Sequence, residues 1–142
     1  MSSIALRKTQ KSALPQKVIV VEDDAVLGLT IEQTLIDGGI GEVTVCSTAA
    51  CTLSKLRAGS YDAVVLDVHL ADSDEGWEIA ELVRAMGDKE VRIVFQTGTP
   101  EEIPADIRQL GSVLAKPYDP QDLLDALRQK PVAGLLSLLL RR

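Results

Sequence analysis

Residues 17–39 read KVIVVEDDAVLGLTIEQTLIDGG, and this stretch decides the fold. Its apolar run Val18–Val21 is typical of a strand that is covered on both faces. Asp24 can cap the helix that follows to about Ile36, and Gly38–Gly39 can end it. The apolar residues of this helix recur every four positions, at Leu27, Ile31 and Leu35. The stretch therefore predicts a buried strand that leads directly into an amphipathic helix.

The same alternation continues along the chain. Further strands are predicted over Val43–Cys46, Ala63–Leu66, Val91–Phe95 and Val113–Ala115. Helices are predicted from Ser47 or Thr48 to Gly59, around Trp77 to Val83, around Ala105–Leu110, and from Asp119–Pro120 to about Gln129. Strands that alternate with helices favour an α/β fold with a doubly wound parallel sheet. We expect one domain over residues 17–130, a flexible N-terminal segment over 1–16 and an apolar tail over 131–142.

The composition limits the class of protein. Of 142 residues, 46% are apolar and only 3% aromatic, so the core must be aliphatic. The net charge of −6 argues against a nucleic-acid surface, which needs clustered Lys and Arg. No apolar run approaches the ~20 residues of a membrane span, and the N-terminus lacks the pattern of a secretion signal. We expect a soluble cytoplasmic protein with no nucleic-acid or membrane partner.

The chain has two cysteines, Cys46 and Cys51. Two cysteines are too few for a disulfide scaffold, and these two are too close together for a zinc cluster. We expect both to be buried structural thiols.

Polar side chains follow four of the predicted strands. The acids Glu22 and Asp23 follow the first and Asp67 the third, while Thr97 follows the fourth and Lys116 the fifth. Because an open α/β sheet carries its site beyond the carboxyl ends of its strands, these groups should meet in one crevice. Converging carboxylates favour a shared hard cation, so Mg²⁺ or Mn²⁺ is expected. A carboxylate beside such a cation, a lysine and a hydroxyl can attack phosphorus and hold the product as an acyl phosphate.

Four motifs in consecutive order carry a family resemblance. VIVVEDDAVL, VVLDVHL, VFQTG and LAKPYDP together resemble the receiver domain of bacterial two-component response regulators. The resemblance covers roughly residues 17–130 and implies the CheY-like, flavodoxin-like strand order 2-1-3-4-5. It implies that Asp67 is the phosphoacceptor, that Thr97 and Lys116 contact the phosphoryl group, and that the Lys116–Pro117 bond is cis.

The resemblance also implies a metal site. Mg²⁺ or Mn²⁺ would be bound by the carboxylates of Glu22, Asp23 and Asp67 and by the backbone carbonyl of His69. The ring of His69, the only histidine in the chain, is not expected to take part.

Three features depart from the family pattern. The loop after Asp67 is one residue longer than usual and has Ala71 in place of a common proline. Val113 stands where many receivers have the aromatic residue that moves with Thr97. The stretch FQTGT with a short fourth helix resembles a subgroup of single-domain receivers with a Phe-Ala-Thr-Gly motif, although Gln96 replaces its alanine.

We therefore expect a single-domain response regulator that accepts a phosphoryl group on Asp67 from a histidine kinase or a phosphotransfer protein. It would signal by phosphorylation-switched binding of a downstream protein or by phosphorelay, and it would not be an enzyme apart from Mg²⁺-dependent self-phosphorylation and autodephosphorylation. One alternative is a docking module that works without phosphorylation. An alternative of another class is a phosphohydrolase that forms an acyl phosphate. The leucine-rich tail is expected to fold back over the domain, with an apolar patch that contacts a second protomer or a kinase as the alternative.

Overall fold

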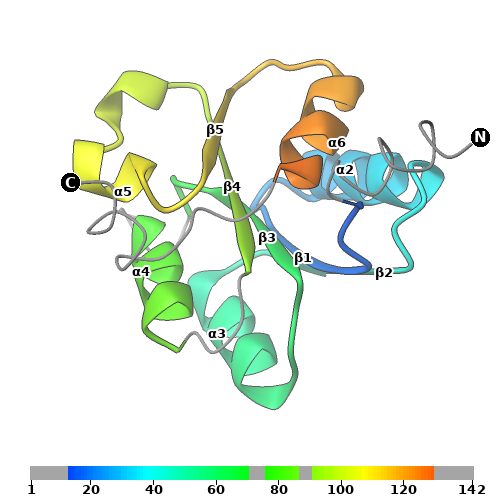
Figure 1. Cartoon of the computed structure of the whole chain (residues 1–142), viewed down its shortest axis with the longest axis horizontal. Coiled ribbons are helices and arrows are strands. Elements are labelled where there is room, and N and C mark those ends of the chain that lie inside the picture. The colour runs from blue at the N-terminus through cyan, green and yellow to red at the C-terminus, as the bar shows by residue number, and fades with distance from the viewer. Residues whose placement is uncertain (1–12, 71–75, 87–90, 130–142) are drawn as a thin grey trace, which may run out of the picture.

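The computed structural model describes residues 13–70, 76–86 and 91–129 (Figure 1). Strands and helices alternate along it: Lys17–Val21 (β1), Ala25–Asp37 (α2), Glu42–Cys46 (β2), Ala49–Ala58 (α3), Ala63–Asp67 (β3), Trp77–Ala85 (α4), Arg92–Thr97 (β4), the 3₁₀ helix Pro100–Glu102 (η1), Ala105–Arg108 (α5), Ser112–Ala115 (β5) and Pro120–Arg128 (α6). All five strands are parallel, in the order β2-β1-β3-β4-β5. The predicted fold class and strand order are confirmed.

The sheet is buried at its centre and exposed at its edges. β1, β3 and β4 are buried at nearly every position, whereas β2 and β5 are mostly half-exposed. Central parallel strands carry helices on both faces, which explains why their sequences are continuously apolar.

Helices cover the two faces of the sheet, with α2 and α6 on one side and α3, α4 and α5 on the other (Figure 1). Each face has its own apolar cluster, because successive side chains of a strand point to opposite faces. The α2–α6 side includes Val20, Val65, Val94, Ile31 and Leu123. The other side includes Val21, Leu66, Phe95, Ile79 and Ile107.

The helices α2, α3 and α6 begin where the sequence predicts. The Asp24 side chain accepts a hydrogen bond from the backbone N–H of Leu27, and Thr48 accepts one from that of Cys51. Asp119 caps α6 in the same way, with Pro120 in the first turn. The caps satisfy N–H groups that have no partner inside the helix.

The expectation of two free thiols is wrong. Cys46, the last residue of β2, forms a disulfide with Cys51 in the first turn of α3, and their Cα atoms are 5.7 Å apart. The short connection between strand and helix turns the chain back on itself, and this brings the two residues within disulfide range.

Residues 13–16 are the described part of the N-terminal segment that precedes β1. Pro15 is buried and Leu14 packs against the α2–α6 cluster. The backbone carbonyl of Gln16 accepts a hydrogen bond from Glu42 N–H at 2.8 Å, which extends the pairing of the edge strand. The predictions for residues 1–12, for the loop 71–75 and for the tail 131–142 lie outside the described residues.

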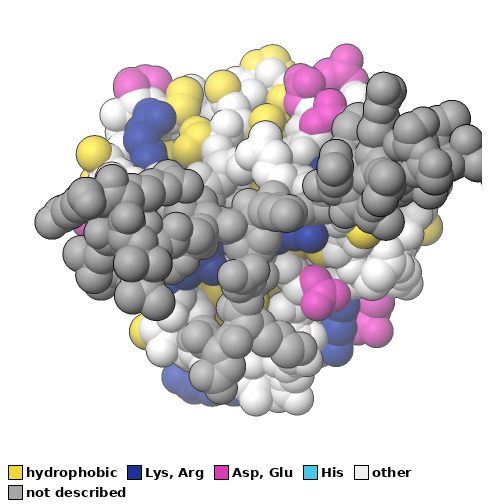
Figure 2. All heavy atoms as spheres, in the orientation of Figure 1, with side chains coloured by type: hydrophobic (Ala, Val, Ile, Leu, Met, Phe, Trp, Pro, Cys, Tyr) yellow, Lys and Arg dark blue, Asp and Glu magenta, His cyan; other side chains and the backbone are white. Residues whose placement is uncertain are grey.

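The face of the molecule shown in Figure 2 is mixed in charge. Lys and Arg side chains are spread in separate groups among acidic and apolar ones on the face in Figure 2. None of the helices among the described residues has the length and the apolar character that a membrane span requires.

Candidate functional site

The alternation of side chains along a strand explains which residues meet at the site. Side chains alternate along a strand, so residues two positions apart share a face of the sheet. On the α2–α6 face, the last apolar residues of four strands are Val20, Val65, Val94 and Leu114. Two positions further along the chain from these residues are Glu22, Asp67, Gln96 and Lys116. The fold thus gathers four polar side chains at the carboxyl edge of the sheet.

The predicted acidic cluster forms. Oxygen atoms of Glu22, Asp23 and Asp67 lie within 4.8 Å of one another. Glu22 and Asp67 are buried, at 2% and 5% exposed, whereas Asp23 faces solvent. Three carboxylate oxygens at such spacing are a donor set that suits a hard divalent cation, and the exposed Asp23 leaves the cluster open to solvent.

Lys116 joins the two buried carboxylates. Its Nζ atom lies 3.0 Å from Oε1 of Glu22 and 3.0 Å from Oδ2 of Asp67. The predicted cis bond between Lys116 and Pro117 is present, and the Lys116 backbone N–H donates to the carbonyl of Thr97 at 2.7 Å. One ammonium therefore partly neutralises two acids.

Lys116 only partly offsets the cost of burying a negative charge on Glu22. Burial raises the pKa of Glu22 from 4.5 to about 7, with the neighbouring Asp67 acting in the same direction and Lys116 opposing it. Burial lowers the pKa of Lys116, but its hydrogen bonds to Glu22 and Asp67 outweigh burial, so the pKa lies above its ordinary value. A divalent cation would relieve the repulsion that Lys116 leaves, so the residues present fit Mg²⁺.

His69 lies at the mouth of the site. Its backbone N–H donates to Oδ1 of Asp67 at 3.0 Å, which orients the predicted phosphoacceptor. Its exposed ring, for which no role was expected, lies 3.2 Å from Oγ1 of Thr99 and 3.4 Å from Oε2 of Glu102. The ring therefore links the segment after β3 to the segment after β4.

Thr97 ends β4 and is fully buried. Its hydroxyl accepts a hydrogen bond from the backbone N–H of Thr99 at 3.0 Å and lies 3.3 Å from the Thr99 hydroxyl. Thr99 in turn donates to Glu102 at 2.8 Å. Thr97 is thus connected through Thr99 to the 3₁₀ helix η1.

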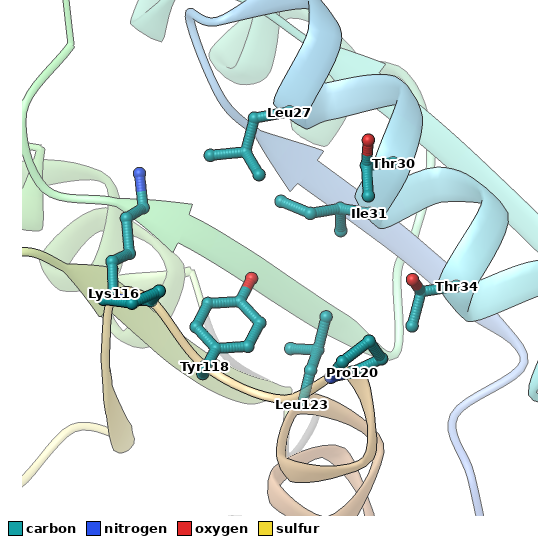
Figure 3. A pocket seen from close by; sticks show the side chains of 9 residues that line it. Leu27, Thr30, Ile31, Thr34, Lys116, Tyr118, Pro120 and Leu123 are labelled. Carbon is teal, nitrogen blue, oxygen red and sulfur yellow. The ribbon is translucent and has the colours of Figure 1, made fainter.

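Sequence reasoning missed two residues of the site. Gln96 is fully buried and hydrogen-bonds to Glu22 at 3.3 Å and to the Tyr118 hydroxyl at 2.6 Å. The available signal was a glutamine at the end of an apolar strand, in the same alternation as the acids of the neighbouring strands. Tyr118 follows the Lys116–Pro117 pair and lines an apolar pocket of about 330 Å³ between α2 and α6 (Figure 3).

Comparisons with known proteins agree with this architecture. The chain matches the family model for the response regulator receiver domain over residues 18–128. Among curated proteins, none matches the sequence.

Solved structures give the same result. A CheY-like receiver domain from Methylobacillus flagellatus has a TM-score of 0.70 at 25% identity, with 78% of this chain and 93% of that chain covered. CheY4 of Vibrio cholerae has a TM-score of 0.67 at 25% identity, with coverage of 81% and 97%. SdrG from Sphingomonas melonis Fr1 has a TM-score of 0.66 at 26% identity, with coverage of 79% and 92%.

Proposed function

The chain belongs to the response regulator receiver domain family, and on this premise we propose that Asp67 accepts a phosphoryl group in a Mg²⁺-dependent reaction. The donor would be a phosphohistidine of a histidine kinase or of a phosphotransfer protein. The observation that carries the proposal is the position of Asp67. This buried carboxylate lies at the end of the central strand β3, within reach of Lys116 and of two further acids.

The chemistry follows from these neighbours. A carboxylate oxygen of Asp67 attacks phosphorus, so that an O–P bond forms while the P–N bond to the donor imidazole breaks and its electron pair returns to nitrogen. The carboxylate oxygen is itself the nucleophile, so no hydroxyl or thiol has to be deprotonated by a separate general base. Lys116 offsets negative charge on the transferred group.

Glu22, Asp23, Asp67 and the backbone carbonyl of His69 would hold the cation. When bound, Mg²⁺ supplies charge neutralisation at the phosphoryl oxygens. Hydrolysis of the acyl phosphate by water would return the protein to its starting state, and we propose no other catalysis.

Signal readout would begin at Thr97. In the unmodified protein its hydroxyl is held by Thr99. A phosphoryl oxygen on Asp67 would compete for that hydroxyl and thereby disturb the Thr97–Thr99–Glu102 connection to η1. The surface around η1 and α5 would then be recognised differently by a downstream protein.

Intact mass spectrometry after incubation with Mg²⁺ and acetyl phosphate tests the proposal. We expect one phosphoryl adduct on the wild type, none on Asp67→Asn, and none on the wild type with a chelator. Asp106→Asn changes an exposed aspartate of α5 and should leave the adduct unchanged. An adduct on Asp67→Asn, or an adduct that persists without Mg²⁺, would contradict it.

One observation favours the docking module that works without phosphorylation. Val113 packs against the core cluster at the position where many receivers carry a moving aromatic side chain. If this alternative holds, the backbone amide resonances of η1 and α5 will be the same with and without acetyl phosphate. Phosphorylation-dependent shifts in these amides, absent from Asp67→Asn, would exclude it.

A further inference from the structure

Gln96 is an amide enclosed in the core with a hydrogen bond at each end. Its Nε2 atom donates to Oε1 of Glu22 at 3.3 Å, and its Oε1 atom accepts from the hydroxyl of Tyr118 at 2.6 Å. The direction of these bonds is set by the amide, since its Nε2 atom can only donate and its Oε1 atom can only accept. Tyr118, Gln96 and Glu22 therefore form a directed chain that ends on the acidic cluster.

The register of β4 against β3 brings the Gln96 side chain close to Glu22. Gln96 is paired in register with Asp67 of β3, and it shares the α2–α6 face with the acids. Its side chain is fully buried, so its polar atoms have little choice of partner. The two hydrogen bonds therefore fix the orientation of the Gln96 amide, and they also restrict the positions of the Glu22 carboxylate and the Tyr118 hydroxyl.

Tyr118 is the first residue of this chain of hydrogen bonds, and its position is fixed by packing. Its ring packs against the α2–α6 cluster and lines the pocket together with Leu27, Ile31 and Leu123 (Figure 3). Burial raises the pKa of the Tyr118 hydroxyl to about 12, further above the neutral range in which a phenol is protonated and can donate. Because packing fixes the ring, the hydrogen bond from its hydroxyl fixes the orientation of the Gln96 amide.

Glu22 is held at both of its oxygen atoms. Oε1 accepts from Lys116 and Gln96, while Oε2 accepts from the backbone N–H of Asp24 at 3.2 Å. Of these donors, Lys116 also donates a hydrogen bond to Asp67. Its ammonium is therefore shared between the two carboxylates. Gln96, in contrast, donates to Glu22 alone. Among the hydrogen bonds of the described residues, its side chain contacts neither of the other two acids of the cluster.

We propose that Gln96, braced by Tyr118, is a positioning residue that fixes the Glu22 carboxylate for binding the divalent cation. This inference rests on the proposed function, because it concerns the same site. It predicts that loss of the amide weakens Mg²⁺ binding without changing the phosphoacceptor itself.

Isothermal titration calorimetry of the full chain with Mg²⁺ tests the proposal. Gln96→Met keeps the size of the side chain and removes both hydrogen bonds, and we expect about tenfold weaker Mg²⁺ binding. Tyr118→Phe removes only the brace, and we expect about threefold weaker binding. The double variant should bind no more weakly than Gln96→Met, because the two residues act in one chain.

A second readout separates positioning from general damage. The rate of phosphorylation by acetyl phosphate should fall in Gln96→Met at limiting Mg²⁺ and recover to within about twofold of wild type at saturating Mg²⁺. Thr52→Val is the matched control, since Thr52 is an equally buried polar residue of α3 whose hydroxyl bonds to Thr48. It should leave Mg²⁺ affinity unchanged.

The outcomes distinguish the two proposals. If the wild type binds Mg²⁺ and is phosphorylated while Gln96→Met binds Mg²⁺ as tightly, the positioning role is overturned and the proposed function stands. If the wild type neither binds Mg²⁺ nor is phosphorylated, both fall. If urea denaturation shows that Gln96→Met does not fold, Tyr118→Phe decides, and unchanged affinity there overturns the role.

Discussion

Lys116 Nζ lies 3.0 Å from Oδ2 of Asp67, although the two residues come from strands that are not neighbours. β4 lies between β3 and β5, so the lysine side chain reaches across the end of β4 to the carboxylate. The contact places a positive charge beside the carboxylate that is proposed to take up the phosphoryl group.

Lys116→Met should remove this charge and keep most of the apolar stem. We expect phosphorylation by acetyl phosphate to slow by about 100-fold, because the charge of the transferred group loses a fixed cation. Intact mass over time measures the rate, with Lys55→Met on the exposed surface of α3 as control. A rate within about threefold of wild type would show that the contact has no role in transfer.

Mg²⁺ binding should depend on pH through Glu22. Its pKa of about 7 means that the carboxyl carries a proton below neutrality, and a cation must displace that proton in order to bind. We expect affinity to rise about tenfold from pH 6 to pH 8, with proton release visible by calorimetry in buffers of different ionisation enthalpy. Glu22→Gln should bind more weakly and lose this dependence. A wild-type affinity that does not vary with pH would rule out titration of Glu22.

The Cys46–Cys51 disulfide should stabilise the fold. It closes a short loop, with a sequence separation of 5, and chain entropy predicts about 2 kcal/mol of added unfolding free energy. Urea denaturation with and without a reductant measures the difference. The variant with Ala at both positions should not respond to the reductant, and equal stability of oxidised and reduced wild type would contradict the prediction.

Gly76→Ala should disturb the segment that follows the phosphoacceptor. An added Cβ would lie 2.6 Å from the backbone oxygen of Asp67 and 2.9 Å from that of Val68. The backbone must shift, so we expect a loss of about 1–3 kcal/mol in unfolding free energy and slower phosphorylation. Gly59→Ala is the control, since its Cβ would meet only Nζ of Lys17 at 3.5 Å. Wild-type stability and a wild-type phosphorylation rate in Gly76→Ala would contradict this prediction.

The elements of the fold follow from local patterns. The apolar run at Val18–Val21, the caps at Asp24 and Thr48 and the Asp119–Pro120 start depend on residues near one another in sequence. Convergence of Glu22, Asp67 and Lys116 also follows, because parallel strands place their carboxyl ends at one edge. Boundaries are less predictable: β4 extends beyond Phe95 to Thr97, because the backbone of its polar last residues still pairs with β5.

The remaining features depend on side-chain contacts between distant residues. Gln96 and Glu22 are 74 positions apart, and their contact requires both the strand register and the rotamers. The Cys46–Cys51 bond required the geometry of the β2–α3 connection, which composition alone does not contain. The ring contacts of His69 likewise depend on where η1 packs, and that helix was not predicted.

Chemical mapping of the phosphorylated residue tests the central claim most directly. The full chain would be incubated with Mg²⁺ and acetyl phosphate and then reduced with borohydride, which converts an aspartyl phosphate to homoserine. Its peptides would then be sequenced by mass spectrometry. The account predicts homoserine at position 67 and aspartate at positions 23 and 24. Homoserine elsewhere, or aspartate retained at 67 in protein that carries the phosphoryl adduct, would contradict it.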